Sequence, residues 1–176
     1  MKPFGPLARV GAVTGLAFAG ILAVSAPAQA GPAEVKLLES YIGTWQGRGV
    51  LTGAEKETVV CRMTITDGNA DKVNYSGRCA MAGTTVSVNG TLAYIDARKR
   101  FEAAMTTNAG FSGVAIGKKS GPGIVFDLKE KAADEKGNDL SVTASITLVP
   151  ERMDVDFGVV FVSSGDSIKA SIPFTK

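Results

Sequence analysis

Apolar residues follow two different periods along this chain. From Pro32 they recur at Val35, Leu38 and Tyr41, the three-residue spacing of one helix face, and a proline suits the start of a helix. After Gly43, apolar and polar residues alternate with a period of two, as in strands that bury one face. The pattern therefore predicts a short helix over residues 32–41 and β-structure from there onward.

Turn residues divide the β-patterned region into about ten predicted strands. The alternation is clearest over residues 140–149, where apolar residues oppose Ser141, Thr143, Ser145 and Thr147. The predicted strands are Thr44–Leu51, Glu57–Thr66, Lys72–Met81, Thr85–Ile95, Arg100–Thr106, Phe111–Gly117, Gly123–Lys131, Leu140–Val149, Arg152–Val162 and Ser167–Phe174.

Short turns between consecutive strands favour an antiparallel meander. A long meander with one apolar face closes into a barrel more readily than it leaves its edges exposed. The apolar face points inward and the outer face is Ser, Thr, Lys and Asp, which indicates a barrel surrounded by water. The predicted fold class is all-β, an antiparallel up-and-down meander barrel of about ten strands with a short N-terminal helix, in a single domain of residues 31–176.

The first 30 residues have the pattern of a cleaved secretory signal. Lys2 and Arg9 form a basic region before an apolar run over residues 10–24, and the Ala-Gln-Ala at residues 28–30 is a small-x-small cleavage site. We expect the mature chain to begin at Gly31 in the periplasm, or outside the cell, and to contain no membrane span. An uncleaved N-terminal anchor or amphipathic helix is the alternative.

The charge of the mature chain is balanced. Residues 1–30 hold two of the 19 Lys and Arg and none of the 17 Asp and Glu, so 17 of each remain. Nucleic acids and anionic membranes are bound through basic stripes. The longest basic cluster, residues 98–100, is typical of a solvated turn, and we expect no nucleic-acid partner.

Histidine is absent from the chain. Its absence excludes the Ser-His-Asp and Cys-His catalytic arrangements, His-ligated zinc and the usual haem ligand. Asp154 and Asp156 share one face of a predicted strand, as catalytic acid pairs sometimes do, but they oppose the apolar residues and are expected to face water. We therefore expect a protein that is not an enzyme and that uses no cofactor.

Cys61 and Cys79 are the only two cysteines. Pairing Ile65 with Tyr75 across the predicted hairpin of residues 57–81 also places Cys61 opposite Cys79, on one face and in register. An even count in an exported chain favours a disulfide. Two buried free thiols are the alternative, and two thiols alone do not complete a tetrahedral metal site.

The only tryptophan lies in the sequence Gly-Thr-Trp-Gln-Gly-Arg-Gly at residues 43–49. The indole of Trp45 suits a plug at the closed end of a small barrel, and Gly47 and Gly49 let the strand bend there. This Gly-x-Trp-x-Gly-x-Gly stretch, after a short helix and before a β-meander, resembles the calycin superfamily of lipocalins, fatty-acid-binding proteins and nitrobindin-like barrels. A strand count near ten is more similar to the latter two.

The resemblance implies a lock at the base of the barrel. In calycins a basic side chain from the last strand typically covers the motif tryptophan, and by position Lys169 is the candidate to cover Trp45, with Arg152 second. Nitrobindin-like barrels hold haem through a histidine near the C-terminus, which this chain lacks. Tyr75 or Tyr94 could ligate iron instead, against the simpler interpretation of each as an aromatic core residue.

Large apolar residues on the predicted inner face, with small ones such as Ala103 and Ala144 among them, either line a pocket or fill the barrel as a solid core. The candidate lumen residues are Tyr94, Phe101, Met105, Phe111, Phe126, Phe157 and Phe161. The leading hypothesis is a binding protein that carries or sequesters a small hydrophobic or amphipathic ligand in its lumen. The second is a solid-barrel periplasmic interaction or inhibitor protein that meets a protein partner through residues 31–36 and the loop 132–138.

Overall fold

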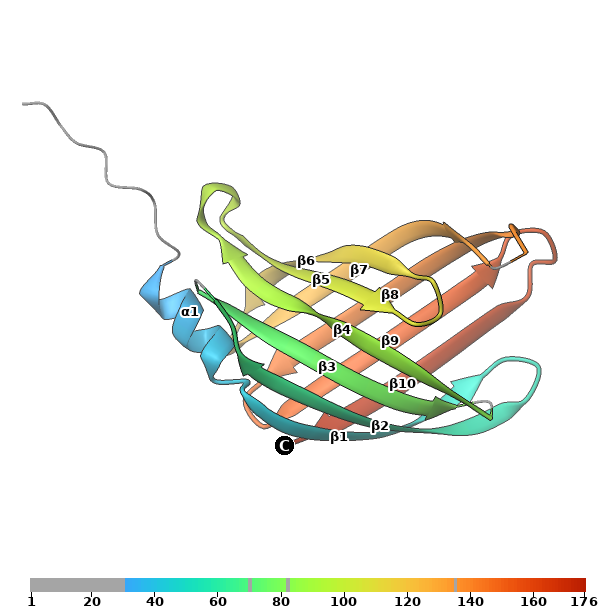
Figure 1. Cartoon of the computed structure of the whole chain (residues 1–176), viewed down its shortest axis with the longest axis horizontal. Coiled ribbons are helices and arrows are strands. Elements are labelled where there is room, and N and C mark those ends of the chain that lie inside the picture. Colours follow the sequence, from blue (N-terminus) through green and yellow to red (C-terminus); the bar gives the residue numbers. More distant parts are fainter. Residues whose placement is uncertain (1–30, 70, 82, 135) are drawn as a thin grey trace, which may run out of the picture.

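A computed structural model describes residues 31–176 except residues 70, 82 and 135. The predicted signal sequence, residues 1–30, lies outside the described residues. The chain forms ten antiparallel strands in sequence order, and the sheet closes into a barrel because the first strand pairs with both the second and the tenth (Figure 1). The predicted fold class, a ten-strand meander barrel with a short helix before it, is confirmed.

The strands match the predicted segments one for one. The elements are α1 (Pro32–Glu39), β1 (Gly43–Thr52), β2 (Lys56–Asp67), β3 (Lys72–Met81), β4 (Thr84–Ile95), the 3-10 turn η1 (Asp96–Arg98), β5 (Arg100–Thr107), β6 (Ser112–Ser120), β7 (Gly123–Ala133), β8 (Asp139–Val149), β9 (Arg152–Phe161) and β10 (Ser167–Thr175). The largest difference is in β6, which continues past the predicted Gly117 because residues 118–120 pair with the start of β7.

The two ends of the barrel differ. Helix α1 and the C-terminus lie at one end, which we call the closed end (Figure 1). The other end, the open end, carries the turns β1–β2, β3–β4, β5–β6, β7–β8 and β9–β10. Within the described residues, no helix combines the length and the apolar character needed to cross a membrane.

Tyr41 and Trp45 fill the closed end, and both are fully buried. The indole Nε1 of Trp45 donates a hydrogen bond to the carbonyl of Tyr41 at 2.9 Å, and the Tyr41 hydroxyl donates to the carbonyl of Leu148 on β8 at 3.2 Å. Burial raises the pKa of Tyr41 to about 12, so its hydroxyl keeps the proton that it donates. The Tyr41 bond joins the segment after α1 to β8, and the Trp45 bond fixes the indole to that segment.

The cation over Trp45 is Lys176, and the prediction of Lys169 is wrong. The Nζ of Lys176 lies 5.6 Å from the ring centroid and also donates to the carbonyl of Ser40 at 3.0 Å. Lys169 is exposed and pairs with Thr52, near the open end. The reason is direction: β10 runs from the open end to the closed end, so the end of the chain and not the start of the last strand reaches Trp45.

Three glycines in the wall each lie opposite an aromatic residue on the neighbouring strand. The pairs are Gly47 with Phe174, Gly90 with Tyr75, and Gly117 with Phe126. A Cβ atom at Gly47 would meet the Phe174 ring at 2.7 Å, and one at Gly90 or Gly117 would also run into the facing ring. Each ring therefore lies over a position of the neighbouring strand that has no side chain, so the ring can pack flat against the wall.

The disulfide prediction is confirmed. Cys61 on β2 and Cys79 on β3 are bonded, and the register that pairs Ile65 with Tyr75 also pairs these two residues, as predicted. The bond ties two neighbouring strands on the inner face of the barrel.

Reducing this disulfide is expected to lower the melting temperature. The cysteines are 18 residues apart, and a covalent loop of that size contributes about 3 kcal/mol by restricting the unfolded chain. Thermal unfolding with and without a phosphine reductant measures the shift. A double Cys61→Ser, Cys79→Ser variant is the control, because its melting temperature should not respond to reductant. An unchanged wild-type value would show that the bond contributes little.

Gly117→Val is expected to lower the free energy of unfolding by about 1–3 kcal/mol, because the new side chain would displace the Phe126 ring. Lys118→Val is the matched control, since Lys118 is the next residue of β6 and is exposed. Urea denaturation of both variants measures the difference. Equal midpoints would mean that Phe126 moves at no cost and that the glycine is not required.

Candidate functional site

The barrel is hollow. It encloses a cavity of about 420 Å³, within the size range of small-molecule pockets. The cavity lies above the packed closed end, with Phe174, Met153 and Leu148 among the residues at its floor, and extends to the β5–β6 turn and the β7–β8 loop at the open end. Ten strands enclose more volume than their inward side chains fill, which leaves this space.

The lining is almost entirely apolar. All four methionines of residues 31–176 line it, namely Met63, Met81, Met105 and Met153. Methionine is unbranched and polarisable, and it adapts to irregular shapes better than other apolar side chains. Only Met105 is among the lumen residues that the sequence predicts. The strand alternation also places Met63, Met81 and Met153 on the inner face, beside the aromatic residues, and this could have identified them as lining residues.

Four of the seven predicted lumen residues line the cavity: Met105, Phe111, Phe126 and Phe157. The other three do not. Phe101 is buried at the closed end, where β5 begins, with its ring centroid 4.9 Å from that of Tyr94. Phe161 is half-buried near the end of β9. Periodicity placed all seven on the inner face, but it carries no information on height along the barrel axis.

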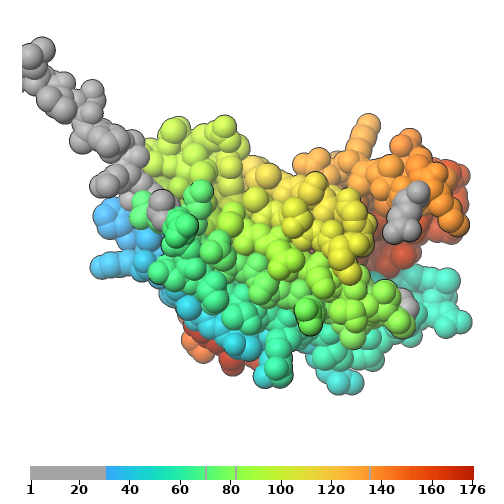
Figure 2. All heavy atoms as spheres, viewed as in Figure 1, coloured from blue at the N-terminus to red at the C-terminus, as the bar shows by residue number. Residues whose placement is uncertain are grey.

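The cavity opens beside a gap in the sheet between β6 and β7. These strands pair only from Ile116–Asp127 to Ser120–Gly123, whereas β7 stays paired with β8 as far as Ala133–Asp139. The first half of β6 therefore has no partner in β7. Figure 2 shows a recess at the same place, between the β5–β6 turn (yellow) and the β7–β8 region (orange).

The Phe111 side chain lies in this gap. A Cβ atom at Gly113 would meet the Phe111 ring at 3.0 Å and the Leu128 side chain at 3.4 Å, so the ring lies over β6 and beside β7. Phe111 is half-buried and lines the cavity. It covers the part of the wall that strand pairing does not.

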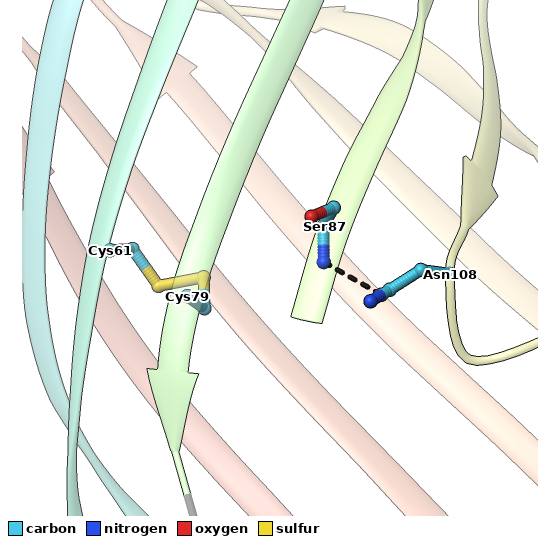
Figure 3. Close-up of a disulfide and its surroundings, with 4 residues drawn as sticks. All are labelled: Cys61, Cys79, Ser87 and Asn108. Atoms are coloured by element: carbon cyan, nitrogen blue, oxygen red, sulfur yellow. Dashed lines mark hydrogen bonds between the residues drawn. A yellow bond between two sulfur atoms is a disulfide. The ribbon is translucent and has the colours of Figure 1, made fainter. Parts of the chain in front are cut away.

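Asn108 attaches the β5–β6 turn to the neighbouring strand β4. Its Oδ1 accepts a hydrogen bond from the backbone N–H of Ser87 at 2.8 Å (Figure 3). Its Nδ2 donates to the carbonyl of Thr85 at 3.0 Å. The backbone N–H of Asn108 also donates to the carbonyl of Ser87 at 3.2 Å, so the side-chain amide reinforces the end of the β4–β5 pairing, which stops at Val88–Thr107. Together these three hydrogen bonds attach the turn that carries Phe111 to β4.

Two titratable side chains line the cavity. The Tyr75 hydroxyl donates to the carbonyl of Ala104 at 3.0 Å, and burial raises its pKa. The Tyr75 hydroxyl, one of the two alternative iron ligands in the sequence, is therefore already hydrogen-bonded to the protein. Asp134 lies at the mouth, where the Asn138 side chain and the backbone N–H groups of Asn138 and Lys136 donate to it and lower the pKa of its carboxyl.

The described residues contain no cluster of three or more Cys, Asp or Glu side chains that could hold a metal ion. Of the acid pair considered from the sequence, Asp154 forms a salt bridge with Arg152 at 2.8 Å and Asp156 is exposed. Both lie outside the cavity lining. The site is therefore an apolar lumen with polar groups at its mouth.

No family model and no curated protein matches the sequence. Solved structures do match the fold. The structure of Rv2717c from M. tuberculosis aligns with a TM-score of 0.65 and 13% identity over 84% of this chain and 99% of that one. The S-type phycobiliprotein lyase CPES from Guillardia theta aligns with a TM-score of 0.54 and 11% identity over 82% and 95%. At these identities the likeness concerns the fold, which fits a calycin-like barrel.

Asn108→Ala is expected to loosen the β5–β6 turn, because it leaves the Ser87 N–H and the Thr85 carbonyl without their partners. A loss of about 1 kcal/mol is expected for these exposed hydrogen bonds. Hydrogen exchange of the Ser87 amide should accelerate several-fold, because a loss of about 1 kcal/mol raises the population of the open state by that factor. Asn89→Ala, at an exposed position on the same strand, is the control. Unchanged exchange at Ser87 would contradict the role of Asn108.

Proposed function

We propose that this protein is an exported, non-enzymatic binding protein that carries or sequesters a small hydrophobic molecule in its lumen. The observation that carries the proposal is the apolar cavity of about 420 Å³. Small barrels can also be packed solid, and a cavity of this size forfeits packing energy unless a ligand fills it. A ligand that removes this apolar surface from water would gain about 25 cal/mol for each Å² buried.

Among the described residues that line the lumen, no nucleophile is paired with a base, which supports a binding role over a catalytic one. The chain has no histidine, and both cysteines are bonded to each other. The buried hydroxyl of Tyr75 is engaged by a backbone carbonyl, and Asp134 is engaged by its own loop. Neither is paired with a second group in the way that acid–base or nucleophilic catalysis requires.

Two features support export. Residues 1–30 have the order of basic, apolar and small residues found in secretory signals. The Cys61–Cys79 disulfide is of the kind that persists in oxidising compartments such as the periplasm. The structural likeness to a phycobiliprotein lyase is compatible with a ligand-binding barrel, although it rests on the fold alone.

The alternative of a solid barrel that acts through its loops has less support, because the lumen is not filled. Hydrogen bonds from Lys136 and Asn138 to Asp134 nevertheless hold part of the loop between β7 and β8. A protein partner at that loop would not require the cavity.

Native mass spectrometry of protein purified from the periplasm tests the proposal directly. We expect a native mass above the denatured mass of the same sample, and the difference identifies the co-purified molecule. The denatured mass should correspond to a chain that begins at Gly31. A full-length chain in the membrane fraction would contradict export.

A lumen-filling variant separates binding in the cavity from binding elsewhere. Ala144 lines the cavity between Leu128 and Phe157 on the neighbouring strands, so Ala144→Phe should weaken the uptake of Nile red, an uncharged apolar dye, by at least about tenfold. Thr143→Phe adds the same ring to the exposed face of β8 and is the control. No uptake by the wild type, or equal loss in both variants, would contradict a lumen site.

A further inference from the structure

We propose that the lumen selects uncharged hydrophobic molecules and rejects those that carry a carboxylate or phosphate group. This inference rests on the proposed function and specifies the class of ligand. It follows from two observations: the described lining of the lumen has no cation, and carboxylates stand at inward positions near the mouth.

The interior offers no cation to pair with an anion. Among the described residues that line the cavity, there is no Lys or Arg, and the described core holds no buried charged or polar residue. The polar groups in the lining are the Tyr75 hydroxyl, the Thr107 side chain and Asp134. The Tyr75 hydroxyl already donates its proton to Ala104, so it is not free to donate to an anion. A carboxylate drawn into this lumen would lose its water without gaining a partner.

The mouth adds negative charge. Strand register places Glu57 opposite Leu51, and Glu130 opposite Val142, so both acids stand at inward-facing positions in the open half of the barrel. Asp134 lines the mouth itself, and Lys136 of the same loop offsets part of its charge. Glu130 is exposed there because β6 no longer pairs with this part of β7.

Basic residues of the same strand alternate onto the other face. Lys129 and Lys131 flank Glu130 and are exposed, opposite Thr143 and Ser141 on the outer side of β8. Lys119 does occupy an inward register position, but it pairs with Ile124 next to the β6–β7 turn, at the closed end. In the described open half, the inward register positions are therefore acidic or uncharged.

Both effects act in the same direction on a bound anion. Desolvation disfavours the charged group inside the lumen. Repulsion from Glu57 and Glu130, at inward positions of the open half, disfavours it toward the mouth, and salt screens this repulsion. An alcohol or ester of the same chain length experiences neither penalty. The discrimination should therefore depend on charge and not on length.

Competition with Nile red at about neutral pH tests the inference, because carboxylates are then ionised. Decanol and methyl decanoate should displace the dye at concentrations at least about tenfold lower than decanoate. Glu130→Gln removes one negative charge and should reduce the ratio of the displacing concentrations of decanoate and decanol. The reduction should be larger at low than at high salt, and the affinity for decanol should stay the same. Decanoate that binds as well as decanol would overturn the inference.

A second variant should reverse the preference. Met105 lines the cavity and is half-buried, so Met105→Arg places a guanidinium in the lumen. This cation should tighten the binding of decanoate relative to that of decanol. Thr106→Arg adds the same charge on the exposed outer face and should change nothing.

The outcomes separate the two proposals. If neither the dye nor any of the three competitors binds the wild type, the lumen-binding function itself fails. If all three bind alike, or if decanoate binds best, binding in the lumen stands and the charge selection is wrong. Failure of Met105→Arg to shift the preference, in a variant that still unfolds cooperatively, would also contradict the charge argument.

Discussion

The pairing of β1 with β10 is the constraint on which the barrel depends, because it removes both free edges of a ten-strand sheet. The pairing is interrupted opposite Pro173, which has no backbone N–H to donate. There β10 presses so closely on β1 that a side chain at Gly49 would collide with the backbone of Ser171 and Ile172. Gly47 meanwhile leaves room for the Phe174 ring. Closure therefore requires these two glycines.

Closure also decides where the lumen is filled and where it is empty. At the closed end, Tyr41, Trp45, Phe101, Phe126 and Phe174 are fully or almost fully buried, and glycines on neighbouring strands make room for the last two rings. Toward the open end the inward residues include methionines, valines and alanines, and the cavity remains between them. The cavity exists because ten strands enclose more volume than the inward side chains fill, and not because of any one residue.

The gap between β6 and β7 lies beside the mouth of this cavity. Phe111 lies over it, on a turn that Asn108 attaches to β4, so local contacts and not strand pairing cover this part of the wall. Local contacts of this kind open more readily than a paired strand. A paired wall beside a locally held turn is compatible with the proposed binding of a ligand in the lumen.

The sequence by itself determined the alternation, and with it the ten strands, the short helix and the register that pairs Cys61 with Cys79. These follow from local periodicity and neighbouring turns. Only the tertiary structure decided that Lys176 and not Lys169 covers Trp45, and that Phe101 lies below the cavity while Phe157 lines it. Those facts depend on strand direction, tilt and height around the closed barrel, and a period of two distinguishes inside from outside but not top from bottom.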